Sequence, residues 1–185
     1  MDYSTLFKAN ELLSSGLFTL GGLPGGGRDM HCFGQEDFAM IFCLQGSVAF
    51  DLRMEMKTQR FRLSEQHLVV IDKRCLQHCD CVPGTVILKY AFVGRMARYM
   101  SFTSRAFHAA ASSVVPVLPR LREWIDRLVL KLMDDGSRHE TFTDECAELA
   151  RLLMEYPKSL LKELYVPVFA CSRLCKKSGE CPFSE

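Results

Sequence analysis

Long apolar runs are missing from this chain of 185 residues. A membrane-spanning helix needs about 20 consecutive apolar residues. The longest runs here, HLVVID at 67–72 and TVILKYAFV at 85–93, have the length of β-strands. The first residues carry an acid at position 2 and no extended apolar stretch, so they do not resemble a secretory signal. The sequence therefore predicts a cytoplasmic protein without a membrane span.

An excess of one charge is also missing. The chain has 23 Lys and Arg against 22 Asp and Glu, which gives a formal net charge of +1. A dedicated nucleic-acid binder normally carries a basic excess on one face. The basic residues of segment 120–131 are interleaved with acids, which is typical of a solvated mixed-charge helix face. No helix-turn-helix pattern occurs in the sequence, so direct DNA binding by these residues is not expected.

Motifs for catalysis and for metal binding are scarce. The five histidines form no H-x-H pair, which is the pattern that would place two imidazoles on one strand face of a metal-binding barrel. A G-x-S-x-G nucleophile motif and a G-K-[ST] phosphate motif are both absent, so GGLPGGG at 21–27 is expected to be a loop. The sequence therefore predicts no enzymatic activity, no metal site and no cofactor.

Cysteine, in contrast, is plentiful. The nine cysteines include two clusters, CLQHCDC at 75–81 and CSRLCKKSGEC at 171–181. Zinc sites are usually built from C-x2-C pairs, which neither cluster contains. Free thiols in a reducing cytoplasm are therefore expected. Because Cys79 and Cys81 would share one face of a strand, a zinc- or redox-sensing module that joins the two clusters stays open as an alternative.

The first 95 residues show short strands between turn signals. FAMIFCLQ and SVAFDLRM flank Gly46, and the second of them alternates apolar and polar residues with a period of two. Shorter strand-like runs follow at 57–63, 67–71, 76–82 and 85–93, with Pro83-Gly84 as a turn. Several short strands in succession predict an all-β barrel or sandwich.

After residue 95 the apolar spacing becomes helical. Residues 95–114 predict a first helix. Pro119 is suited to start a second helix and Gly136 to end it. Shorter helices are expected at 144–156 and 158–165. The sequence thus predicts an α+β protein with a β-barrel or sandwich at 1–95, a C-terminal helical hairpin with a short extra helix at 96–169, and a flexible Cys-rich tail at 170–185.

The expected helices carry apolar stripes that must be buried. Their members recur at spacings of three and four residues. Such a stripe packs on the strands, on a second copy of the chain, or on both, and the sequence leaves the two roles open. The residues expected to carry helix packing and a two-fold interface are Leu121, Trp124, Leu128, Leu149 and Leu153.

The strand interiors supply a candidate ligand pocket. A β-barrel of about eight strands either fills itself with side chains or holds one small ligand. Core packing and a lined pocket for a small effector therefore both stay open. The inward-facing residues proposed to line the pocket are Phe38, Met40, Phe42, Val48, Phe50, Leu88 and Tyr90.

Two helical stretches carry a family resemblance. PVLPRLREWIDRLVLKLMDDG at 116–136 and ELARLLMEYPKSLLKELYVPVF at 148–169 resemble the region that precedes the DNA-binding domain in a group of Bacteroidetes AraC-type transcription regulators. The shared features are the Pro-Val-Leu-Pro start, the amphipathic helix ending in Asp-Gly, and the Tyr-Pro-Lys turn followed by a leucine-rich helix. F-x-L-x-G-S-V at 42–48 and L-x4-L-V-V-I at 63–71 also resemble the strand pairs of the family's barrel.

The resemblance implies a cupin-like barrel followed by a dimerisation region. The chain is then expected to be the effector-sensing and dimerisation domain of an AraC-type regulator, without enzymatic activity. The expected partners are a second copy of the chain and a small-molecule effector, with DNA reached only through a helix-turn-helix domain outside these residues. The alternatives are a metal-dependent cupin enzyme, the zinc or redox module, and a structural dimer with a filled barrel.

Overall fold

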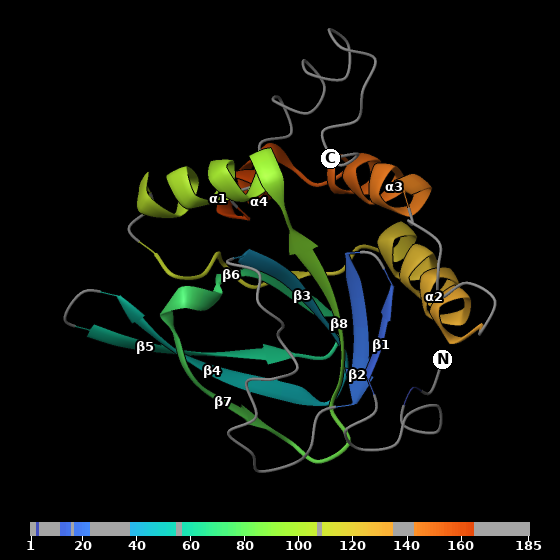
Figure 1. Cartoon of the computed structure of the whole chain (residues 1–185), viewed down its shortest axis with the longest axis horizontal. Helices are drawn as coiled ribbons and strands as arrows, with labels where there is room; N and C mark the ends of the chain where they lie inside the picture. The colour runs from blue at the N-terminus through green and yellow to red at the C-terminus, as the bar shows by residue number, and fades with distance from the viewer. Residues whose placement is uncertain are drawn as a thin grey trace, which may run out of the picture.

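The computed structural model describes Tyr3 and residues 12–15, 17–22, 38–54, 57–106, 109–134 and 143–164 (Figure 1). Antiparallel sheets and α-helices make up these segments, so the predicted α+β class is confirmed. The strands are β1 (Leu12–Ser15), β2 (Phe18–Gly22), β3 (Phe38–Gln45), β4 (Ser47–Met54), β5 (Lys57–Ser64), β6 (His67–Asp72), β7 (Leu76–Cys81), β8 (Val86–Phe92) and β9 (Val115–Pro116). The helices are α1 (Gly94–Ala106), α2 (Pro119–Met133), α3 (Thr143–Leu153) and α4 (Lys158–Glu163).

The strands form two separate sheets. The large sheet has the order β1-β2-β8-β3-β6-β9, and the small sheet has the order β5-β4-β7. Although β3 and β4 meet at Gly46, they do not pair with each other. Strand β3 bonds to β6 and β8, whereas β4 bonds to β5 and β7. Gly46 is thus a corner between sheets, and in the described segments no closed cupin-like barrel is found.

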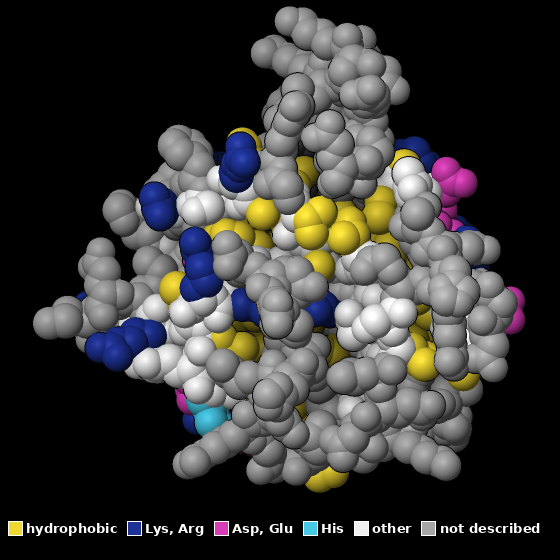
Figure 2. All heavy atoms as spheres, in the orientation of Figure 1, with side chains coloured by type: hydrophobic (Ala, Val, Ile, Leu, Met, Phe, Trp, Pro, Cys, Tyr) yellow, Lys and Arg dark blue, Asp and Glu magenta, His cyan; other side chains and the backbone are white. Residues whose placement is uncertain are grey.

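The molecule has three layers. The small sheet packs on one face of the large sheet, and the helices pack on the other (Figure 1). Strand β3 serves both interfaces because successive side chains point to opposite faces. Its residues Phe38, Met40 and Phe42 belong to the core under the helices. Ala39 and Ile41 belong to the core between the sheets. Figure 2 shows apolar side chains gathered where the helical layer meets the strands.

Most predicted elements are found close to their predicted bounds, with three corrections. Strands β1 and β2 were not predicted, and Gly21 and Gly22 of the expected loop are the end of β2; positions 23–27 lie outside the described residues. The first helix ends at Ala106 rather than at 114. Beyond it, the Ser112 hydroxyl accepts a hydrogen bond from Val70 N at 2.9 Å. The backbone of the same segment also pairs with β6, since Ser112 N donates to the Val70 carbonyl and Asp72 N donates to the Ala110 carbonyl, both at 2.8 Å, so these residues extend the sheet and do not continue the helix.

Three of the four basic residues of α2 pair with acids of α3 and of the turn that follows it, whereas Arg122 pairs with Asp126 of α2 itself. As the three basic residues advance along α2, their carboxylate partners come earlier in the chain, so the two helices are antiparallel. Ion pairs at the protein surface each contribute at most about 1 kcal/mol to stability. These pairs therefore contribute more to the alignment of the two helices than to the stability of the fold. The pairs are Arg120 with Glu155 at 2.6 Å, Arg127 with Glu148 at 3.0 Å, and Lys131 with Glu145 at 2.7 Å.

Tyr156 ties the end of the helical layer to the start of α2. Its hydroxyl donates to the Pro116 carbonyl at 2.8 Å and accepts from Leu118 N at 3.2 Å. Burial raises the pKa of Tyr156 to about 12, so the hydroxyl keeps its proton over the physiological range. Tyr156→Phe leaves two backbone groups without this partner, and we expect it to lower the free energy of unfolding by about 1–3 kcal/mol.

Urea unfolding followed by circular dichroism measures this change. The slope of the transition serves as the internal control, because an unchanged slope means that the unfolded and folded states are as compact as before. Equal midpoints for Tyr156→Phe and wild type would contradict the role of this hydroxyl.

Candidate functional site

The large sheet separates the seven predicted pocket residues into two groups. Phe38, Met40, Phe42, Leu88 and Tyr90 point toward the helices and are at most 2% exposed. The register explains this grouping, since β3 and β8 are paired residue by residue at these positions. Val48 and Phe50 instead lie in the core between the sheets. The seven residues therefore do not line one cavity.

The five predicted helix-packing residues lie together in the core under the helices. Each is between 1% and 5% exposed, so their packing is satisfied within a single chain. The large apolar side chains that α2 and the end of α3 leave exposed are different ones, Leu130 at 55% and Met154 at 45%. A two-fold interface through the helices would therefore use the outer face of the helical layer, and that interface stays a prediction. The five buried helix-packing residues are Leu121, Trp124, Leu128, Leu149 and Leu153.

A lysine that the sequence analysis did not single out lies in the middle of the large sheet. Lys89 of β8 is only 2% exposed, and it is the only Lys or Arg of the described segments that is buried. Along β8 it points to the same side as Ile87, toward the small sheet. The sequence signal was available, because Lys89 is the single charged residue in the run TVILKYAFV.

Lys89 stands at the centre of a row of paired residues that crosses five strands. The row runs Ser14, Thr19, Lys89, Ile41 and Val69, from β1 through β2, β8 and β3 to β6. Its polar end is at the sheet edge, where the Ser14 hydroxyl donates to Thr19 Oγ1 at 3.2 Å. Its apolar end is fully buried between the sheets. The inner face of the large sheet is thus amphipathic along this row.

Some of the positions next to Lys89 on the same face carry small side chains. Ala91 lies two residues further along β8 and is paired with Ala39 of β3. Ile87 lies two residues before Lys89 and is paired with Gly21 of β2. Burying a charge costs several kcal/mol unless acidic or polar groups compensate it, and Lys89 does interact with another group of the protein. Because a lysine ammonium offers three hydrogen-bond donors, a protein partner and an anionic group can share it.

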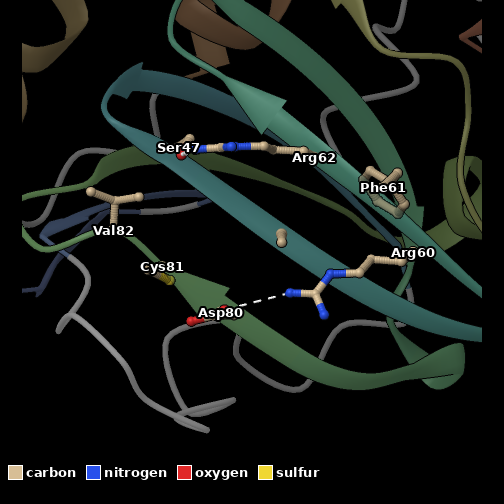
Figure 3. A pocket seen from close by; sticks show the side chains of 8 residues that line it. Ser47, Arg60, Phe61, Arg62, Asp80, Cys81 and Val82 are labelled. Carbon is tan, nitrogen blue, oxygen red and sulfur yellow. Dashed lines mark hydrogen bonds and ion pairs between the residues drawn. The ribbon is translucent and has the colours of Figure 1, made fainter.

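A hollow of about 480 Å³ lies against the small sheet and is lined by polar and apolar side chains. Figure 3 shows Arg62 reaching toward Ser47 and Arg60 toward Asp80. Arg62 donates to the Ser47 hydroxyl from Nη2 at 2.7 Å and from Nε at 3.2 Å. Arg60 forms ion pairs with Asp80 at 3.5 Å and Asp51 at 3.7 Å. Both guanidinium groups are thus engaged with protein oxygens. The lining residues are Ser47, Ala49, Arg60, Phe61, Arg62, Asp80, Cys81 and Val82.

Among the described residues, no group of three or more His, Cys, Asp and Glu side chains is placed to hold a metal ion. The second cysteine cluster, 171–181, lies outside the described residues, so the alternative of a zinc site that joins the two clusters is not tested by this structure. No helix of the described part is long and apolar enough to cross a membrane.

Comparison with known proteins gives no family for this chain. Neither a family model nor a curated protein matches it. Two solved structures that overlap with it are of ToxT, an AraC-family regulator. ToxT from Vibrio cholerae O395, bound to (E)-4-(8-methylnaphthalen-1-yl)but-3-enoic acid, covers 77% of this chain with a TM-score of 0.40 and 7% identity. Apo ToxT from Vibrio cholerae strain SCE256, in a variant form, covers 94% with a TM-score of 0.37 and 8% identity. This chain spans 58% and 57% of their lengths. Likenesses this low assign neither a family nor a function.

Proposed function

We propose that this chain is the effector-sensing domain of an AraC-type transcription regulator and that it binds its effector on the inner face of the large sheet. The observation that carries the proposal is the burial of Lys89 in the middle of that face. The resemblance of segments 116–136 and 148–169 to AraC-type regulators indicates the class of protein to which the domain would belong. The proposed domain binds a ligand and catalyses no reaction, and DNA is contacted through a helix-turn-helix domain outside these residues.

The row through Lys89 defines the chemistry of the proposed effector. An anionic group would accept hydrogen bonds from the Lys89 ammonium and lie beside Thr19. An apolar body that extends over Ile41 toward Val69 would displace the side chains of the small sheet that now cover both residues. The proposed effector is therefore a small organic acid with an apolar body. Its charged end gives specificity, and burial of its body provides most of the affinity.

Strand β8 connects this site with the helical layer. Tyr90 follows Lys89 directly and points to the opposite face of the sheet, where its ring centroid lies 5.1 Å from that of Phe18. The Phe18 ring in turn lies 5.9 Å from the ring of Trp124 on α2. A ligand that shifts β8 would therefore change the packing of α2. In the proposed mechanism the effector favours one arrangement of the helices, and a homodimer formed through their outer face transmits it to the DNA-binding domains.

A matched pair of probes tests the role of Lys89. The anionic dye 8-anilinonaphthalene-1-sulfonate has an uncharged counterpart, N-phenyl-1-naphthylamine, with the same aromatic body. A charged hydrogen bond contributes about 1.5–3 kcal/mol, and 1.4 kcal/mol corresponds to about tenfold in affinity. Lys89→Met removes the charge and keeps an unbranched side chain that is one atom shorter. We expect it to weaken binding of the sulfonate by about tenfold or more and to leave binding of the uncharged dye within about twofold.

Fluorescence titration of both dyes against wild type and Lys89→Met gives the four affinities. The exposed Arg53 on β4 provides the control, since it alternates with the inward-facing Leu52 and Arg53→Met removes a positive charge from the outer face of the small sheet. Equal weakening of both dyes would indicate damage to the fold rather than loss of an anion site. Unchanged affinity for the sulfonate would contradict the proposal.

A further inference from the structure

Two cysteines lie side by side in the core between the sheets. Cys79 and Cys81 of β7 share its inner face, opposite Phe50 and Val48 of β4. Their Sγ atoms are 3.7 Å apart. Cys79 is 1% exposed and Cys81 is 7% exposed. Cys81 is also one of the residues that line the hollow on the small sheet.

The thiols of the described segments differ in their readiness to ionise. The hydrogen bond from Cys79 lowers the pKa of Cys81, against burial and the Asp80 carboxylate, which both raise it. Burial, with a smaller contribution from Glu65, raises the pKa of Cys43 to about 12. Because the thiolate is the nucleophilic form, we expect Cys81 to be the attacking thiol and Cys43 in the same core to be the less reactive one.

We propose that Cys79 and Cys81 form a reversible dithiol–disulfide site that hydrogen peroxide oxidises. The Cys81 thiolate attacks one peroxide oxygen, the O–O bond breaks, and after protonation Cys81 is a sulfenic acid and one water is released. The Cys79 sulfur then attacks the Cys81 sulfur, forming the S–S bond and releasing a second water. In total, two thiols and one peroxide give one disulfide and two waters. This site does not depend on effector binding at Lys89.

The geometry of β7 makes such a disulfide easy to reduce again. Residues two apart on a strand have Cα atoms about 6.6–6.8 Å apart, at the upper end of the range of about 4.4–6.8 Å that disulfides span. Closing the bond therefore contracts the strand. Strand β7 is at the edge of its sheet, and its ladder with β4 already shifts between Asp51 and Leu52. Strained disulfides have more oxidising potentials, which is the property of a reversible site.

Peptide mapping of the peroxide-treated full chain tests the proposal. The reduced protein is exposed to hydrogen peroxide, quenched in acid, alkylated and digested with trypsin. The peptide 75–89 contains Cys75, Cys79 and Cys81. We expect it to lose two hydrogens, with Cys75 alkylated and a disulfide between Cys79 and Cys81, and dithiothreitol to restore both thiols. Cys43 is the internal control and is expected to stay alkylatable throughout.

Two variants separate the attacking thiol from the resolving one. Cys79→Ser is expected to accumulate a sulfenic acid at Cys81 that dimedone traps. Cys81→Ser is expected to give no adduct at Cys79 with the same peroxide exposure. A disulfide that includes Cys75 would overturn the proposal, and so would oxidation of Cys43 while Cys79 and Cys81 stay reduced. The wild-type map decides the question even if one variant fails to fold.

Discussion

Replacing Trp124 by alanine is expected to lower the free energy of unfolding by about 3–5 kcal/mol, because large-to-small changes of buried aromatic residues cost this much. Trp124 is the only tryptophan of the chain and is 2% exposed. Its ring meets Phe18 edge to face, with the centroids 5.9 Å apart. Phe18 packs on Tyr90, which packs on Phe92. The substitution opens a cavity at the point where α2 meets this aromatic cluster.

The measurement is urea unfolding followed by far-UV circular dichroism, which does not need the lost tryptophan. Leu130→Ala is the matched control, since Leu130 lies on the same helix and is 55% exposed. Substitutions at such surface positions change stability by about 0.5 kcal/mol or less. If both variants lost the same small amount of stability, α2 would not be packed on the large sheet, and the proposed path from Lys89 to the helices would fail with it.

The sequence predicted elements well where one face is buried and the other is not. The alternation in SVAFDLRM corresponds to β4, whose Val48 and Phe50 lie between the sheets while Asp51 faces outward. The stripe of Leu121, Trp124 and Leu128 is likewise buried on one side of α2. In both cases the period of the apolar residues carries the information about burial.

The same reasoning could not place the candidate pocket. In β3, seven of eight residues are buried, so apolar residues occupy both faces and their period gives no inward side. Phe38 and Met40 were assigned to the interior of a barrel, whereas they lie under the helices. Lys89 could have been found from its charge in an apolar run. The position of Lys89 beside Thr19 could not have been predicted, because β2 was not predicted and pairing between distant strands leaves no local sequence pattern.

The corner at Gly46 also depends on a distant contact. Gly46 has a φ of 77°, a left-handed conformation that costs an L-residue about 1–2 kcal/mol. A Cβ added there would lie 2.7 Å from Thr85 Oγ1 and 3.0 Å from Thr85 Cα. The Thr85 hydroxyl cannot easily move, because it accepts from Ser47 N at 3.2 Å and lies 2.6 Å from the Val82 carbonyl oxygen. Overpacking a rigid site costs about 1–3 kcal/mol more.

We therefore expect Gly46→Ala to lower the free energy of unfolding by about 2–5 kcal/mol. The turn between β7 and β8 supplies the control. Gly84 has a φ of 79°, but no atom lies within 4 Å of an added Cβ. Gly84→Ala is thus expected to cost only the conformational part, about 1–2 kcal/mol.

Urea unfolding of the two variants isolates the contact with Thr85, since the backbone strain is common to both. Equal losses would mean that the corner relaxes freely. A larger loss at Gly46 would mean that the close approach to Thr85 fixes the point where the chain leaves the large sheet for the small one. This corner then also determines how the two sheets enclose the core that contains Lys89 and the Cys79–Cys81 pair.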